Sequence, residues 1–239
     1  MSPLKAIDAD TNESALSFKL SHSDKTRNFV CPACNAEMLL VLPKKKIIKH
    51  FRHKTGNAHG ENETIAHLNA KHIIMLAAQK SGFEVDVEHY IKEYGEIHVI
   101  DVLIKMKNKT YAVECQHSGI STEEIDKRNA FFRKHGMIPK WVFVEGKTYK
   151  PRKRNGHNEV RLKKSELHIL KKTKHLEYIL TTPARVTTEF EFATREHGDS
   201  YNVYGDYIPP YTVTLETIGS YKNYKTQDLK HLLPEDDNI

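Results

Sequence analysis

Residues 100–118, IDVLIKMKNKTYAVECQHS, decide the fold, because they have the pattern of a strand, a tight turn and a second strand. Apolar and β-branched residues on both faces of each strand predict that this hairpin lies inside a covered sheet. A turn closed between Met106 and Lys109 sets Asp101 opposite Glu114, and a slip of one turn residue sets Asp101 opposite Gln116 instead. Either register brings two carboxylates within about 5–8 Å of each other on neighbouring strands.

The acids of this hairpin favour a hard divalent cation as their partner. Glu114 and Gln116 share a face because side chains alternate along a strand, and Cys115 is expected to be buried on the opposite face in a structural role. The alternative is a solvent-facing edge strand, where acids are common. The apolar runs around Asp101 and Glu114 favour the metal, since no Lys or Arg nearby on the strand neutralises these carboxylates.

The composition is that of a soluble globular protein with a substantial core. The chain has 239 residues, of which 38% are hydrophobic and 28% charged, enough for one medium domain with appendages or two small domains. No apolar run approaches the length of a membrane span, and the polar start has no signal-peptide core, so we expect a cytoplasmic protein. The three cysteines favour thiols that serve a metal over a disulfide framework.

Basic charge is concentrated in the middle of the chain. The net charge is +6, and residues 147–175 hold eleven Lys or Arg against two Glu. Within this segment, Tyr149 beside Arg152, Lys153 and Arg154 suits a nucleic-acid backbone. The alternative is a flexible, solvated linker.

Four residues of the types that zinc prefers follow the polar start of the chain. Cys31-x2-Cys34 and His50-x2-His53 are separated by fifteen residues, which indicates a closed tetrahedral zinc site on a ribbon or knuckle. The alternative is that the two histidines are a coincidental surface pair.

Two helices flank the hairpin in the sequence. The first, which ends at Ser81 and Gly82, places Glu63, His67 and Lys71 on one face, either in a functional cluster or in an ordinary exposed ladder of Glu and Lys. The second begins at Ser121 with a capping box, and the apolar strand at 139–144 should return parallel to the strand before that helix. The order helix, three strands, helix, strand predicts an α/β core.

These motifs together resemble the competence protein CoiA-like family over about residues 29–146. The motifs occur in the family's order, and they are listed here: Cys31-x2-Cys34, His50-Phe51-Arg52-His53, Glu63-Thr64-x2-His67-x3-Lys71, Asp101-Val102, Glu114-Cys115-Gln116-x-Ser118, Arg128 and Trp141. The resemblance implies a restriction-endonuclease-like mixed sheet flanked by helices, preceded by a Cys/His zinc motif. That nuclease core has Gln, here Gln116, where many relatives have Lys, and the chain departs from the family at position 99, where Val stands in place of a common Arg.

The resemblance also implies roles for the motif residues. Glu63, Asp101, Glu114 and Gln116 would be active-site positions, with Asp101 and Glu114 as ligands of Mg²⁺ or Mn²⁺. His67, Lys71 and Arg128, together with the basic segment, would contact the nucleic acid.

The organisation expected from the sequence has five parts. They are a polar N-terminal extension (1–28), a zinc-binding knuckle (29–60), a nuclease core (61–146), a basic loop and helix (147–175) and a small β-rich appendage (176–239). The appendage is the natural surface for a protein partner, and the sequence gives no oligomeric state.

The expected function is a metal-dependent nuclease that hydrolyses DNA phosphodiesters, or RNA, in DNA uptake, recombination or defence against foreign DNA. It would carry structural zinc and catalytic Mg²⁺ or Mn²⁺. Two alternatives remain open: a non-catalytic zinc-dependent nucleic-acid-binding protein, and an adaptor of a defence complex.

Overall fold

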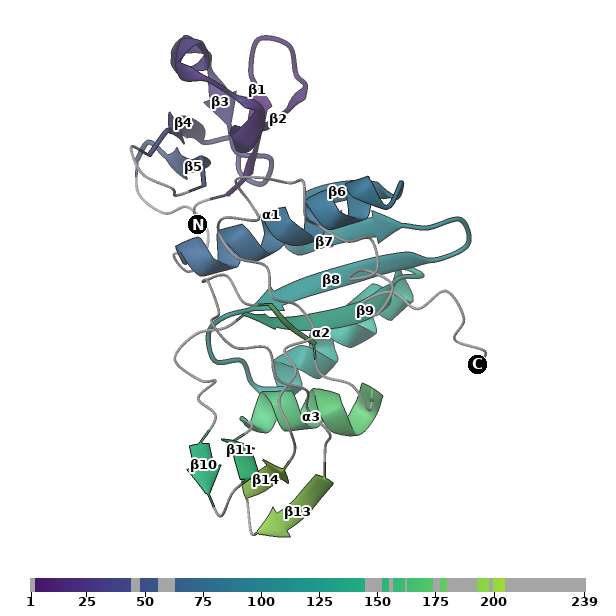
Figure 1. The fold of residues 1–239 in the computed structure, drawn as a ribbon. Coiled ribbons are helices and arrows are strands. Elements are labelled where there is room, and N and C mark those ends of the chain that lie inside the picture. Colours follow the sequence, from purple (N-terminus) through teal and green to yellow (C-terminus); the bar gives the residue numbers. More distant parts are fainter. Residues whose placement is uncertain are drawn as a thin grey trace.

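The mixed α/β class expected from the sequence is confirmed. The computed structural model describes residues 3–43, 48–55, 63–144, 152–154, 157–161, 163–173, 177–179, 193–197 and 200–204. Within these ranges the strands form three sheets, and helices lie against the central one (Figure 1).

The central sheet has the strand order β12-β9-β8-β7-β6. Along the chain, β6, β7 and β8 come first and form an antiparallel meander. The helix α2 then leads to β9, which pairs parallel with β8 as the sequence predicts. The strands are β6 (Glu84–Glu93), β7 (Glu96–Lys105), β8 (Thr110–Gln116), β9 (Ile138–Val144) and β12 (Glu177–Ile179).

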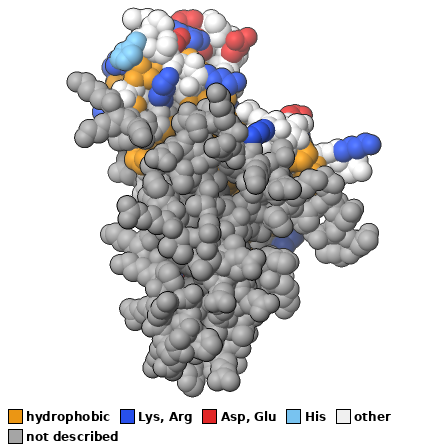
Figure 2. All heavy atoms as spheres, in the orientation of Figure 1, with side chains coloured by type: hydrophobic (Ala, Val, Ile, Leu, Met, Phe, Trp, Pro, Cys, Tyr) orange, Lys and Arg blue, Asp and Glu red, His pale blue; other side chains and the backbone are white. Residues whose placement is uncertain are grey.

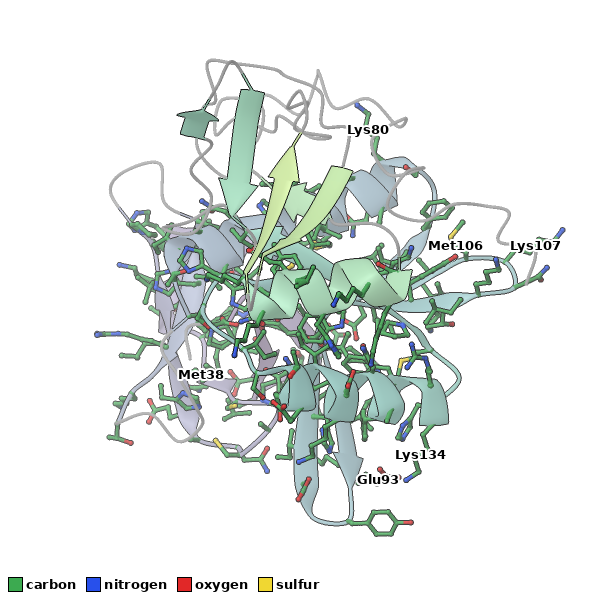
Figure 3. The ribbon with its side chains drawn as sticks, turned by 90° about the horizontal axis from the view of Figure 1, so that it is seen from below. Met38, Lys80, Glu93, Met106, Lys107 and Lys134 are labelled. Atoms are coloured by element: carbon green, nitrogen blue, oxygen red, sulfur yellow. The ribbon has the colours of Figure 1, made fainter. Side chains whose placement is uncertain are left out.

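The register of the β7–β8 hairpin is the first of the two expected from the sequence. Val102 pairs with Val113, and the Met106 N–H donates to the Lys109 carbonyl at 2.8 Å. The same register sets Asp101 level with Glu114. Figure 3 shows Met106 and Lys107 at the outer tip of the hairpin, so these acids lie well inside the sheet and away from the turn.

Helices cover both faces of the central sheet. The helix α1 (Ile65–Lys80) packs on the face that carries Val102 and Val113, and α2 (Thr122–Lys134) packs on the face that carries Leu103 and Ala112. The N-cap of α2 is Ser121 as expected, with its hydroxyl accepting from the Glu124 N–H. The third helix, α3 (Lys164–Thr173), lies against α2.

The N-terminal part of the chain forms its own antiparallel sheet, with the order β2-β1-β3-β4-β5. The sequence suggested an unpatterned extension before residue 29, whereas the structure has two strands there. The polar composition hid them because Asp8 is buried, with its carboxylate satisfied by Arg27 and by the N–H groups of Asp10 and Thr11. The elements are β1 (Lys5–Asp8), β2 (Ser14–Leu16), the 3-10 helices η1 (Ser17–Lys19) and η2 (His22–Thr26), β3 (Phe29–Val30), β4 (Glu37–Val41) and β5 (His50–His53).

This N-terminal sheet covers the outer side of α1. Leu4 is fully buried in the core that α1 shares with the central sheet, and Leu16, Phe18 and Ile48 pack against the same core. As a result α1 is buried on two sides, which places even Lys71 at 1% exposure. The view in Figure 2 shows basic, acidic and apolar side chains mixed on the described surface of the N-terminal sheet.

His72 of α1 provides a pH-sensitive contact under this cover. Its ring lies 4.5 Å from the Phe18 ring, and burial lowers its pKa from 6.5 to about 4. The folded state therefore disfavours the imidazolium, and stability present above pH 6.5 is lost as the pH falls towards 4. The full effect is about 3 kcal/mol, because one pKa unit corresponds to about 1.36 kcal/mol.

We expect His72→Leu to unfold with a shallower dependence on pH between 6.5 and 4 than the wild type. Urea unfolding at a series of pH values measures this slope. His22→Leu, at an exposed position, is the matched control and should keep the wild-type slope. Equal slopes for the wild type and His72→Leu would contradict the burial argument.

The region after residue 144 is described in parts. Strands β10 (Arg152–Arg154), β11 (His157–Arg161), β14 (Ser200–Tyr204) and β13 (Ala193–His197) form a third, antiparallel sheet. The acidic tail and most of the expected appendage at 176–239 lie outside the described residues. No helix in the described ranges is long and apolar enough to cross a membrane.

Candidate active site

Three carboxylates stand level with one another on adjacent strands of the central sheet. In the β6–β7 ladder, Val87 pairs with Val102 and His89 pairs with Ile100, so the register is the same on both sides of Glu88. The pair between them, Glu88 with Asp101, is missing from the ladder. Glu88 has a positive φ of 51°, a strained conformation for this residue type. The sheet is therefore distorted where its acids lie, which is typical of a functional site.

Asp101 is held from two directions. Its Oδ2 lies 3.0 Å from Nε2 of His67 and accepts the backbone N–H of Cys115 at 2.8 Å. Burial opposes ionisation here, but His67 outweighs it and holds the pKa of Asp101 well below its usual range. The same partnership raises the pKa of His67 against the effect of its own burial. Asp101 is thus a fixed anion that faces α1.

Lys71 is the cation of a buried cluster. Its Nζ lies 2.8 Å from Oε1 of Glu63 and also contacts Oε1 of Glu88. Burial opposes its charge, but these two carboxylates hold the pKa of Lys71 well above its usual value. The helical spacing of Glu63, His67 and Lys71 therefore serves an interior cluster, and the exposed ladder of the sequence analysis is wrong.

Glu88 is a residue that the sequence analysis did not select. It is 1% exposed, and its carboxylate accepts the backbone N–H groups of Leu4 at 2.9 Å and Lys5 at 3.0 Å as well as contacting Lys71. It therefore joins the N-terminal sheet to the acidic cluster. A Glu in a strand pattern normally indicates an exposed face, and no local signal marked its partners.

Glu114 faces α2 and pairs with Arg128. The Nη1 of Arg128 lies 2.8 Å from Oε2 of Glu114, and its Nη2 donates to the Val99 carbonyl at 3.4 Å. The Arg128 guanidinium from α2 thus reaches position 99, where the family commonly carries Arg and this chain has Val. Burial raises the pKa of Glu114 to about 8, although Arg128 opposes the shift.

Two buried carboxylate oxygens have no hydrogen-bond donor among the described residues. They are Oε2 of Glu63 and Oε1 of Glu114. Burying such an atom without a partner is costly, and a cation is one partner that would offset the cost. Around Asp101, three carboxylates (Glu63, Glu88 and Asp101) face the Lys71 ammonium and the His67 imidazole, so one carboxylate remains in excess even when His67 is charged, which fits an added cation.

The sequence also assigned Gln116 to the active site and the segment at 152–154 to nucleic-acid contact. The Gln116 amide donates to the Ser118 carbonyl at 2.9 Å, so it is bound within its own loop. Arg152, Lys153 and Arg154 form β10, but their side chains lie outside the described residues.

A second group of ligands lies in the N-terminal sheet. Atoms of Cys31, Cys34 and His53 lie within 4.8 Å of one another, and the Cys34 Sγ is 3.6 Å from Nε2 of His53. His50 does not join them, because its side chain and that of His53 leave opposite faces of β5. Its Nδ1 instead lies 3.1 Å from the Ile48 carbonyl oxygen.

Comparisons with known proteins agree with the sequence motifs. The model of the competence protein CoiA nuclease-like domain matches residues 63–201. Competence protein CoiA of Bacillus subtilis (strain 168) is 30% identical over 121 residues, which cover 49% of this chain and 32% of that protein. The chain thus aligns with about a third of that relative's length.

A solved structure is also similar in part. A crystal structure of a protein of unknown function, AF1548, covers 48% of this chain and 58% of its own at 14% identity and a TM-score of 0.31. The family match includes α1, the central hairpin and its acids, and on that match the chain belongs to the family of the competence protein CoiA nuclease-like domain.

Proposed function

We propose that the chain is a divalent-metal-dependent nuclease that hydrolyses DNA phosphodiesters and acts in DNA uptake, recombination or defence against foreign DNA. The observation that carries the proposal is the pair of buried, unpartnered carboxylate oxygens, Glu63 Oε2 and Glu114 Oε1, on residues that flank Asp101. Carboxylate oxygens in this number suit Mg²⁺ or Mn²⁺. When bound, such an ion activates water and neutralises charge on the phosphate.

The protein side chains have distinct roles in this proposal. Asp101 and Glu114 are the expected ligands of the ion, but in this structure they face α1 and α2 respectively, so both bind one ion only after a side chain turns. Glu63 would contribute an outer ligand, positioned by Lys71 through the 2.8 Å contact at its other oxygen. His67 faces the cluster from α1 with Nε2 3.0 Å from Asp101 and Nδ1 3.5 Å from Glu63, so it would donate to a phosphate oxygen only by giving up one of these contacts. Arg128 would contribute positive charge from α2, and the basic segment at Arg152, Lys153 and Arg154 would hold the DNA backbone.

A non-catalytic nucleic-acid-binding role is the second candidate, and Gln116 favours it. An amide lacks the positive charge of the Lys found in many relatives, and it hydrogen-bonds to Ser118 within its own loop. Gln116 would at most orient water or a phosphate oxygen. Chemistry in this chain would then depend more heavily on the metal.

Incubation of the purified chain with single- and double-stranded DNA and RNA separates the candidates. We expect cleavage of DNA with Mg²⁺ or Mn²⁺ and none with EDTA. Binding without cleavage on every substrate would overturn the nuclease proposal in favour of the binding role. Cleavage of RNA alone would retain the chemistry and replace the substrate.

We also propose that Cys31, Cys34 and His53 hold a structural zinc ion. Two thiolates and an imidazole are the ligands that Zn²⁺ prefers, and their atoms already lie within 4.8 Å of one another. His50, the fourth residue expected from the sequence, reaches this ion only if the backbone of β5 turns over. The ion would brace the sheet that covers α1.

Substitution separates the three clustered ligands from His50. Cys34→Ser and His53→Ala should lose about one zinc per chain and some stability, because such sites contribute folding energy. His50→Ala should retain zinc, and metal analysis of the purified variants decides. Zinc loss in His50→Ala would restore it as the fourth ligand, and unchanged zinc in all three variants would remove the site.

The location and partners are part of the same proposal. A cytoplasmic protein with DNA, or RNA, as its main partner fits the expected chemistry, and the region at 176–239 remains our candidate surface for a protein partner.

A further inference from the structure

Three ligand atoms of different chemistry converge where α1 crosses β7 and β8. A ring nitrogen of His67, a carboxylate oxygen of Asp101 and the Sγ of Cys115 all lie within 4.8 Å of one another. The first two are 3.0 Å apart, and the Cys115 backbone N–H donates to Asp101 at 2.8 Å. Each residue comes from a separate, well-packed element, so the group is held in place.

The interruption of the β6–β7 ladder explains why Cys115 belongs to this group. Alternation along the strands predicts that Cys115 and Asp101 face opposite sides of the sheet. In the structure Ile100 packs on the α2 side while Val102 packs on the α1 side, with Asp101 turned towards His67 between them. Cys115 also packs on the α1 side, and its thiol therefore faces the same space as the Asp101 carboxylate.

This set of ligand types does not suit Mg²⁺ but suits a softer ion. Mg²⁺ takes oxygen ligands, whereas Zn²⁺ binds thiolate, imidazole and carboxylate in tetrahedral sites. The bond lengths of such a site place its ligand atoms about 3.3–3.5 Å from one another. The atoms here need only small side-chain adjustments to meet this spacing, and the excess of carboxylates around Lys71 favours added positive charge.

We propose that His67, Asp101 and Cys115 form a second metal site, which binds Zn²⁺ or an ion of similar softness. Binding requires a thiolate and a neutral imidazole, so the Cys115 S–H bond breaks as a metal–sulfur bond forms, and the thiol proton is released to solvent together with the second ring proton of His67 when that ring is charged. Because Asp101 is shared, Zn²⁺ here competes with the hard ion of the proposed nuclease. The metal site itself stands without the proposed function, and only the competition rests on it.

Metal counting and Co²⁺ spectroscopy on the full chain test the site. After exposure to Zn²⁺ and removal of the excess, the wild type should hold about two ions per chain and Cys115→Ala about one. In Co²⁺-loaded protein, each thiolate bound to the metal adds near-ultraviolet absorption. One of the three cysteines is Cys115, so Cys115→Ala should lose about a third of that absorption.

A second ligand variant and a control variant test whether loss of the ion comes from loss of a ligand or from misfolding. His67→Ala should lose the same ion, whereas His98→Ala, whose ring stacks on Phe131 at 3.8 Å on the α2 side, should retain it. A zinc count in Cys115→Ala and His67→Ala equal to that of the wild type, or unchanged Co²⁺ absorption in both ligand variants, would overturn the proposal.

An activity measurement then separates this inference from the nuclease proposal. If the wild type cleaves DNA with Mg²⁺, added Zn²⁺ should inhibit that cleavage. No cleavage with a count of about two would retain the metal site and reject the nuclease, while cleavage that Zn²⁺ leaves unchanged would reject the competition.

Discussion

Asp101→Asn should lower metal-dependent DNA cleavage by about a thousandfold, the order of effect seen when one group that stabilises transition-state charge is removed. Asn keeps the shape of the side chain and can still accept the Cys115 N–H, so the local fold should survive. What it removes is the negative charge that His67 holds in place at 3.0 Å. Single-turnover cleavage at saturating Mg²⁺ measures the chemical step, and Mg²⁺ titration measures the accompanying loss of metal affinity.

Glu84→Gln is the matched control for this variant. Glu84 lies on the same sheet, but its side chain is 70% exposed and pairs with Lys105 at the surface. We expect the wild-type rate from the control. If Asp101→Asn cleaved as fast as Glu84→Gln, Asp101 would not be a ligand of the catalytic ion.

Lys71→Met should destabilise the fold by about 3–5 kcal/mol, the cost of leaving buried charges without their partner. Met fills nearly the same space as the Lys stem but leaves Glu63 and Glu88 without their ammonium at side-chain exposures of 9% and 2%. The expected loss therefore comes from unpaired carboxylates and not from a cavity. Urea unfolding of the full chain measures it.

Two further variants locate the origin of that loss. Lys105→Met breaks an ion pair with exposures of 49% and 70% and should cost no more than about 1 kcal/mol. The double variant Lys71→Met with Glu88→Gln should recover part of the loss, because one of the stranded charges is gone. A cost for Lys71→Met equal to that for Lys105→Met would mean that the cluster is hydrated.

The sequence was sufficient for the central hairpin, because local rules determine it. Turn length limited the hairpin to two registers, and the structure has the one that pairs Val102 with Val113, while the Ser121 cap marked the start of α2. The parallel return of β9 followed from the helix between it and β8. The acids Asp101 and Glu114 were recognisable because charges are rare in such strands.

Contacts between distant segments were beyond the reach of sequence patterns. The burial of Lys71 depends on the N-terminal sheet, whose short polar strands have no clear periodicity. The role of Glu88 depends on backbone N–H groups of Leu4 and Lys5, which any residue except Pro carries and which therefore leave no trace in residue identity. Asp101 turns towards Cys115 because the β6–β7 ladder is interrupted beside it. The sequence does not predict this interruption, because a Glu such as Glu88 rarely has a positive φ.

If Cys31, Cys34 and His53 hold zinc as proposed, the hydrogen bond from the Leu4 N–H to Glu88 connects metal supply to the stability of the whole molecule. The N-terminal sheet contains the Cys31, Cys34 and His53 group, and the same sheet covers α1 and buries Lys71. An ion that binds only the docked sheet stabilises docking by mass action, and docking must raise the affinity for that ion by the same free energy. Metal scarcity would therefore act at a distance, through hydration of the acidic cluster, without any ligand leaving the centre itself.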